Sequence, residues 1–226
     1  LILNISKYFV RIKFCHIYSS RIGHLTINFD SAILSISENT FLFCSHDKKI
    51  SNKFILNIFK KQKKVFFKKF FKHFYNAILK VKPNSNYIIS WREYGPLFSY
   101  KLRLKSKIKL PYYSSIELEK ILSRYGVKKN FVSLHARNNL YMQKYRLDDK
   151  NFHDFRNFDF NDYSLVIEYL KKKNNSVIKL GETFPEENFK MPEGSFFSSK
   201  DFSSNEEIDY LLNTYSRYNI IGNSGI

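Results

Sequence analysis

Histidine and arginine side chains with the chemistry to bind an anion gather at the end of one apolar segment in the second half of the chain. His135 and Arg137 follow the apolar residues that begin at Phe131, and Arg156 comes shortly before the next predicted helix. An apolar strand does not easily bury a guanidinium, so Arg137 should emerge where the strand ends. In open parallel sheets ligands bind at that edge. Arginine makes paired, charge-assisted hydrogen bonds to phosphate oxygens, so this spacing predicts a phosphate pocket.

The ends of two later predicted strands add groups of the same kind. Gly181 and Glu182 follow the strand Ser176–Leu180. The strand Tyr218–Ile221 runs into a turn made of Gly222, Asn223, Ser224 and Gly225. Bare backbone N–H groups and a hydroxyl at the start of a helix bind phosphate. Together with the two arginines, this turn predicts a diphosphate site at the carboxyl edge of a sheet.

Each of these elements also has an ordinary structural explanation. Arg137 has Asp148 and Asp149 as alternative ion-pair partners, and the glycine turn is also compatible with a simple chain reversal. Because the arginines and the glycine turn are all predicted at the same edge of one sheet, an anion-binding site is favoured over these separate explanations. The sequence has no Gly-x-Gly-x-x-Gly fingerprint, no Gly-Lys-Ser/Thr phosphate loop and no Cys/His cluster with metal-ligand spacing. We therefore expect no cofactor and no metal site.

The first half of the chain has a similar pattern with fewer polar groups. The predicted strand Val10–Tyr18 is followed by Arg21, Gly23 and His24 and then by an apolar-periodic segment, and Thr40–Ser45 reads as a second strand. A strand, a tight turn at a glycine and a helix begin a Rossmann-like unit. We expect Gly23 to form that turn, with Arg21 and His24 beside it.

The segment from residue 52 to residue 82 is the most basic part of the chain. Its aromatic and aliphatic side chains recur at helical spacing, with lysines between them. This pattern predicts one or two amphipathic helices. In one interpretation the apolar stripe packs on a sheet and the lysines face water. In the other the helix lies on an anionic lipid surface. The two are compatible, and both stay open.

The second half alternates predicted helices and strands. Ser115–Tyr125 reads as a helix, Phe131–His135 as a strand and Tyr163–Lys173 as a helix capped by Asn161 or Asp162. The apolar face of that last helix is predicted to consist of Leu165, Val166, Tyr169 and Leu170. Strands separated by single helices require right-handed crossovers, which make a parallel sheet.

The fold class predicted from these elements is α/β, with two Rossmann-like domains of parallel strands flanked by helices. The boundary falls between Leu97 and Ser115, in a stretch with few helical or strand signals. We place the N-terminal domain at residues 1–110 and the C-terminal domain at residues 111–226. The chain starts at Leu1 and stops at Ile226 just after a strand and turn, so we expect a fragment with an incomplete second domain.

The formal charge of +18 and the isoelectric point near 9.7 favour an anionic partner, such as nucleic acid, an acidic membrane surface or a phosphorylated substrate. The abundance of Lys, Asn, Ile, Phe and Tyr is also typical of AT-rich genomes, which accounts for part of the charge. Cys15 and Cys44 lie in apolar runs and are expected to be reduced core residues. No apolar run reaches the ~20 residues that span a bilayer, and a secretory signal is absent, so we expect a cytoplasmic location.

In four short sequence blocks the chain resembles a family of bacterial glycosyltransferases found in surface-polysaccharide and lipopolysaccharide gene clusters. The resemblance covers most of the chain and rests on the blocks RIGH (Arg21–His24), SLHAR (Ser133–Arg137), FHDFRN (Phe152–Asn157) and IIGNSGI (Ile220–Ile226). That family is distantly similar to fucosyltransferases of the GT-B type, whose His-x-Arg motif contacts the phosphates of a nucleotide-sugar donor.

The resemblance implies a sugar transfer from a nucleotide-sugar donor to a surface glycan or lipid-linked acceptor, with no obligatory metal. It implies an N-terminal acceptor side, with Arg21, Gly23 and His24 in its loop, and a C-terminal donor side. Arg137 and Arg156 would hold the diphosphate, and His135 and the 222–225 turn would line the donor pocket. The basic segment 52–82 adds peripheral contact with the inner face of the membrane to the expected cytoplasmic location.

A general base must deprotonate the acceptor hydroxyl in such a reaction, and the candidates are His24, Asp154 and Glu182. The alternative function is that of a non-catalytic basic protein. The lysines and aromatic residues of the segment 52–82 would then bind nucleic acid or an anionic membrane surface.

Overall fold

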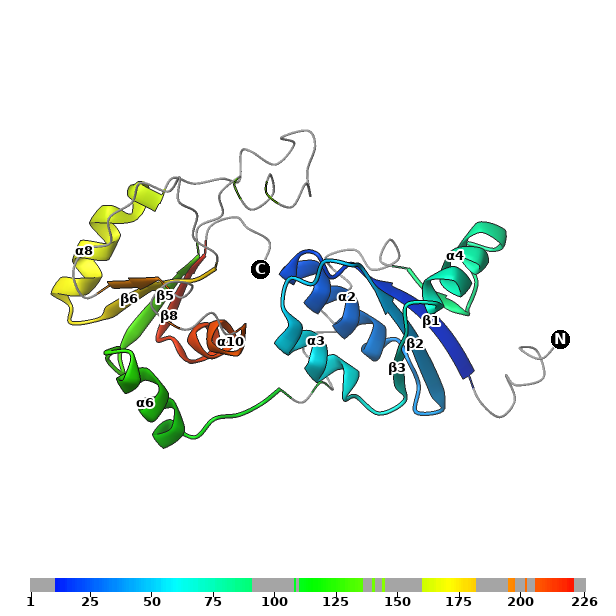
Figure 1. Cartoon of the computed structure of the whole chain (residues 1–226), viewed down its shortest axis with the longest axis horizontal. Helices are drawn as coiled ribbons and strands as arrows, with labels where there is room; N and C mark the ends of the chain where they lie inside the picture. The colour runs from blue at the N-terminus through cyan, green and yellow to red at the C-terminus, as the bar shows by residue number, and fades with distance from the viewer. Residues whose placement is uncertain are drawn as a thin grey trace. The chain divides into compact units, whose positions relative to one another are not determined.

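The computed structural model describes residues 11–90, 108, 110–135, 140, 144, 160–181, 195–197, 202 and 206–221. The chain divides into two compact units, Leu1–Pro111 and Tyr112–Ile226, and each is described by itself. Figure 1 shows the elements of both units, coloured along the chain.

Unit 1 is built on a four-stranded parallel sheet in the order β3-β2-β1-β4. Its elements follow the chain as β1 (Arg11–Ile17), α2 (Ile22–Leu34), β2 (Thr40–His46), α3 (Lys53–Lys60), β3 (Val65–Phe67), α4 (Phe71–Val81) and β4 (Ile88–Ile89). The first strand therefore lies inside the sheet, between the second strand and the last.

Unit 2 repeats this arrangement, with a four-stranded parallel sheet in the order β7-β6-β5-β8. Its elements are α6 (Ser115–Arg124), β5 (Phe131–His135), the 3-10 turn η3 (Phe160–Tyr163), α8 (Ser164–Lys172), β6 (Ser176–Lys179), β7 (Ser195–Phe197), α10 (Glu206–Tyr215) and β8 (Tyr218–Ile221). Both units are thus α/β, and their strand order is compatible with Rossmann-like folds.

The two faces of the unit 1 sheet are covered unequally. On one face Leu25 and Phe29 of α2 and Leu56 of α3 pack on Ile17 and Leu42. On the other face only α4 contributes a helix among the described residues, and its Phe71 and Tyr75 pack on Phe14 and Ile88. Figure 1 shows α2 and α3 on one side of the sheet and α4 on the other.

Unit 2 has a core on each face of its sheet. Leu122 of α6 and Leu211 of α10 pack with Phe131 and Ile178 on one face. Ile167 of α8 packs with Leu134 and Val177 on the other. Helix α6 begins with a capping box, in which Ser114 and Glu117 exchange hydrogen bonds with each other's backbone N–H, and this satisfies donors that a helix start leaves open.

The prediction of one or two helices across residues 52–82 missed a strand. Helices α3 and α4 are separated by β3, which pairs with β2 from Leu42 to Cys44. The aromatic doublets Phe66–Phe67 and Phe70–Phe71 are compatible with a strand as well as with the predicted helix, because adjacent side chains in a strand point to opposite faces. Phe66 stacks on Phe43 at 5.3 Å between ring centroids, whereas Phe67 stacks on Phe29 at 5.8 Å on the other face.

The predicted cap of α8 and most of its predicted buried face were wrong, since only Leu170 of that face packs in the core. Asn161 and Asp162 belong to the 3-10 turn, and the residue before α8 is Tyr163, which makes no side-chain cap. The helix instead packs through Ile167 and Leu170, with Tyr163, because these lie four and three residues apart on one face. Leu165 is 77% exposed and Tyr169 is 60% exposed.

The core of unit 1 should depend on the stacked pair Phe29 and Phe59. Phe29 is fully buried and its ring lies 4.1 Å from that of Phe59. Phe29→Ala should therefore lower the free energy of unfolding by about 3–5 kcal/mol through lost contacts and a cavity. Phe70→Ala, at an exposed aromatic residue, should lower it by about 1 kcal/mol or less. Urea denaturation followed by circular dichroism measures both, and equal losses would contradict this packing.

Candidate functional site

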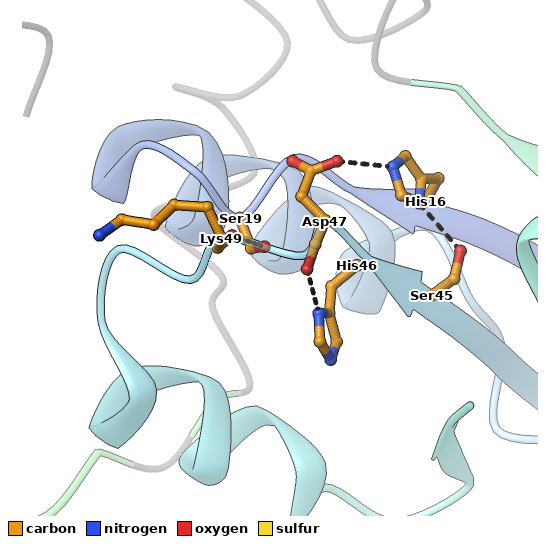
Figure 2. Close-up of polar contacts among 6 residues, drawn as sticks. All are labelled: His16, Ser19, Ser45, His46, Asp47 and Lys49. Atoms are coloured by element: carbon orange, nitrogen blue, oxygen red, sulfur yellow. Dashed lines mark hydrogen bonds and ion pairs between the residues drawn. The ribbon is translucent and has the colours of Figure 1, made fainter. Parts of the chain in front are cut away.

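A polar cluster lies at the carboxyl edge of the unit 1 sheet, where β1 and β2 end. The parallel register places His16 beside Ser45 and Ile17 beside His46, and Asp47 follows directly. His16 Nδ1 lies 2.9 Å from Ser45 Oγ, and His16 Nε2 lies 3.1 Å from Asp47 Oδ1 (Figure 2). His16 donates Nε2–H to the carboxylate, and its Nδ1 lies within hydrogen-bond distance of the Ser45 hydroxyl. Both ring nitrogens are engaged, so His16 orients Asp47.

Asp47 is held as an anion at the sheet edge. Burial by itself would raise the pKa of this carboxyl. The hydrogen bond from His16 and the positive charges of His16 and Lys72 outweigh it, and they hold the pKa below its ordinary value. The side chain keeps 24% of its surface exposed, so the carboxylate is fixed and still reachable from solvent.

Backbone contacts join the loop after β1 to the loop after β2. Ser19 Oγ donates to the carbonyl of Lys49 at 2.8 Å, and the Ser51 N–H donates to the carbonyl of Ser19 at 2.7 Å. His46 Nδ1 donates to the carbonyl of Asp47 at 2.7 Å, as Figure 2 shows. These bonds hold Asp47 in place, because they fix the backbone on both sides of it.

The predicted loop residues Arg21, Gly23 and His24 all lie at the start of α2. Arg21 is the N-cap residue, in extended conformation and without a side-chain cap. Gly23 was expected to form the tight turn after β1. It lies instead inside the first turn of α2, because the chain has already reversed at Ser19 and Ser20. The glycine is buried.

His24 is a neutral imidazole near neutral pH. Burial lowers its pKa below the ordinary value, and the charge of Arg21 lowers it further, while the charge of Asp47 opposes them. The structure thus brings His24, predicted from the sequence, into electrostatic contact with Asp47, which the sequence reasoning did not single out. A neutral imidazole within electrostatic reach of a carboxylate can accept a proton, and the carboxylate then stabilises the imidazolium.

A second candidate site lies at the carboxyl edge of the unit 2 sheet, between β5 and β8. His135 ends β5 and pairs in register with Ile221 of β8. Its Nδ1 is buried, and the described part of the chain supplies no hydrogen-bond partner for it. Burial, and then the charge of Lys179, lower its pKa to about 4, so the ring is neutral near neutral pH.

Lys179 is the functional candidate of unit 2 that sequence reasoning missed. It ends β6 in register with Leu134 and is only 2% exposed. Lysine is almost never fully buried without a compensating group, so a lysine inside the apolar run Ser176–Leu180 was the available signal. Gly181, two residues further on, has φ +89°, a left-handed conformation that glycine adopts readily.

Several predicted site residues lie outside the residues that the structure describes. These are the donor-side residues Arg137, Arg156, Gly222, Asn223, Ser224 and Gly225 and the candidate bases Asp154 and Glu182. The roles proposed for them stay predictions.

The two cysteines are free and buried, as predicted. They are neighbours in the register of β1 and β2, and burial raises the pKa of Cys15 to about 12, which keeps its thiol protonated. Within the described ranges, no group of three or more His, Cys, Asp and Glu side chains could hold a metal ion. None of the helices in that part of the chain is both long and apolar enough to cross a membrane.

A comparison with models of known protein families finds no match, and no curated protein matches the sequence either. The geometry of the two sheet edges therefore carries the functional argument.

The buried, neutral state of His135 predicts a pH dependence of stability. In the unfolded chain a histidine binds a proton near pH 6.5, but in the folded chain it does so only near pH 4. The unfolded state therefore gains protons first, and stability falls as the pH drops from 6.5 to 4. Between pH 7.5 and 5.0 the loss due to this group is about 2 kcal/mol.

The variant His135→Gln cannot take up this proton. Its free energy of unfolding should therefore fall by about 2 kcal/mol less than that of the wild type between pH 7.5 and 5.0. Urea denaturation at both pH values measures the difference. Parallel losses in the two proteins would show that His135 is not held neutral by the fold.

Proposed function

We propose that the protein is a glycosyltransferase of the GT-B type, which moves a sugar from a nucleotide-sugar donor to a surface glycan or lipid-linked acceptor. The observation that supports this most is the repeated strand order. Both units have a parallel sheet whose first strand is flanked by the second and the last, and in both a neutral histidine lies at the carboxyl edge. Open α/β sheets bind ligands at that edge, where the strand order reverses.

Unit 2 is the proposed donor side. His135 presents a buried ring nitrogen with no hydrogen-bond partner among the described residues, within electrostatic reach of the buried Lys179 of β6. A fixed positive charge and a hydrogen-bonding imidazole would stabilise the negative charge that develops on a leaving nucleoside diphosphate. Arg137 and Arg156, two and twenty-one residues beyond His135 in the sequence, are the proposed phosphate ligands, so the reaction would not depend on a metal ion.

Unit 1 is the proposed acceptor side, with His24 as the general base. In an inverting transfer the acceptor oxygen bonds to the anomeric carbon while the bond from that carbon to the diphosphate oxygen breaks. The diphosphate leaves with the electron pair, and the hydroxyl proton passes to the neutral imidazole of His24. Asp47, anionic and oriented by His16, stabilises the imidazolium that results.

The first test is a panel of nucleotide sugars against the thermal stability of the full chain. A donor present at 100 times its dissociation constant should stabilise the fold by about 3 kcal/mol and raise the melting temperature. Arg137→Ala should abolish the shift, whereas Lys172→Ala, at an exposed position of α8, should preserve it. If no nucleotide sugar shifts the melting temperature, the proposal fails.

The second test separates catalysis from donor binding. His24→Gln should lower the rate of sugar transfer by about 10²–10⁴-fold and leave the donor-induced thermal shift unchanged, since it removes only the proton acceptor. Asp47→Asn should lower the rate by a smaller factor. His73→Gln, an exposed histidine of α4, is the matched control and should retain full turnover in a soluble-acceptor assay. A His24→Gln protein as active as this control would remove His24 from the mechanism.

A further inference from the structure

Among the described residues of unit 1, a single helix covers one face of the sheet, and that face is aromatic. Among the described residues α4 is the only helix packed there, against β1 and β2. Phe66 at the edge strand β3 is 45% exposed, and Phe70 and Phe74, just before and within α4, are each 52% exposed. Exposed phenylalanine in a cluster is unusual on the surface of a monomeric protein and marks an interaction site.

These rings form one continuous row. Phe66 stacks on Phe43 at 5.3 Å, and Phe14 lies between Phe43 and Phe74, at 5.6 Å from each. Phe70 continues the row with an edge-to-face contact to Phe74 at 6.1 Å. The exposed rings are therefore anchored to the sheet through buried and half-buried rings, so the row is a preformed apolar surface.

The sequence that carries this row is rich in lysine. From Lys48 to Lys82 the sequence has twelve lysines and no acidic residue. Lys68, Lys69 and Lys72 lie between the exposed phenylalanines along the chain, and all three are exposed. Asp47 is a carboxylate whose charge interacts with that of Lys72, but the lysines outnumber it, so the surplus of positive charge favours an anionic partner.

We propose that this aromatic–lysine surface, made of Phe66, Lys68, Lys69, Phe70, Lys72 and Phe74, docks on an anionic lipid bilayer. Phenylalanine has no polar atom and can enter the boundary between headgroups and acyl chains. Lysines reach lipid phosphates while their stems cover apolar surface. The eleven residues of α4 would lie in the plane of the interface. This inference does not depend on the proposed sugar transfer.

The ring geometry favours a bilayer over nucleic acid. Single-stranded nucleic acid binds by stacking its bases on open aromatic faces. Here one face of Phe74 is covered by the stacked ring of Phe14, and Phe70 and Phe74 meet edge to face. Phe66 is likewise stacked on Phe43. Insertion into lipid needs only the exposed edges of the rings and their apolar area.

The test is binding of the full chain to vesicles of phosphatidylcholine with and without phosphatidylglycerol, measured by flotation. We expect binding to the anionic vesicles only, weakened at high salt because ions screen the lysines. Phe70→Ser with Phe74→Ser should lower the partition coefficient at least about tenfold, since apolar area no longer leaves water. Lys68→Gln with Lys69→Gln should lower it roughly thirtyfold. Lys72 is left unchanged because its charge acts on Asp47.

The matched control is Leu165→Ser with Tyr169→Ser on α8. These are also exposed apolar side chains next to lysines, but the exposed Glu168 lies among them. The control should bind vesicles like the wild type, and all variants should keep the wild-type melting temperature within a few degrees. Equal loss in the control, or unchanged binding of the phenylalanine variant, would overturn the proposal.

Two other occupants would give different results. Binding of a single-stranded oligonucleotide at physiological ionic strength, with no binding to anionic vesicles, would assign the surface to nucleic acid and overturn the proposal. Dimerisation in the absence of lipid, abolished by the phenylalanine substitutions and accompanied by no vesicle binding, would assign it to a second copy of the chain and overturn it as well.

Discussion

Two neighbouring parallel strands must be joined by a segment of chain that returns across a face of the sheet. This requirement determines where polar side chains can gather in both units. Strands that run in one direction all end at one edge, so residues far apart in the sequence meet there. His16 and Asp47 are 31 residues apart and become hydrogen-bonded because β1 and β2 run parallel in register. His135 meets β8 for the same reason.

The electrostatics of each edge follow from its position. At the rim of unit 1, Asp47 is buried enough to be oriented by His16 and exposed enough to keep its charge. His24 sits where burial and Arg21 disfavour protonation, so a neutral imidazole and an ionised carboxylate, both with lowered pKa values, lie within electrostatic reach of each other. Perturbed pKa values of this kind cluster at functional sites. In unit 2, burial and the charge of Lys179 keep His135 neutral.

Strong local signals made much of the α/β organisation predictable. Phe131–His135 was predicted with the bounds that the structure has, since an apolar run between a glycine turn and a polar segment fits a buried strand. β3 was missed because the doublets Phe66–Phe67 and Phe70–Phe71 satisfy a helical period as well as a strand period. The prediction of the buried face of α8 failed because Leu165 and Tyr169 share a helical stripe that tertiary packing leaves in solvent.

Among the site residues, His24 could be predicted from its place after a strand. Asp47 and Lys179 could not, since their roles depend on the register of the strands and on burial between them. The phosphate ligands proposed from the sequence remain predictions.

The strand order also constrains when each unit can complete its fold. β1 is the first strand of unit 1 to be synthesised, but its second neighbour, β4, ends only at Ile89. Until then one side of β1 has no strand beside it and presents unpaired backbone groups, the kind of edge on which strands of other chains can pair. Unit 2 meets the same delay, because β5 ends at His135 and its second neighbour β8 begins at Tyr218. Among the strands that become paired on both sides, the one that ends at the proposed site in each unit therefore waits longest for its second neighbour during synthesis. Protection of nascent chains should therefore matter most for these two strands.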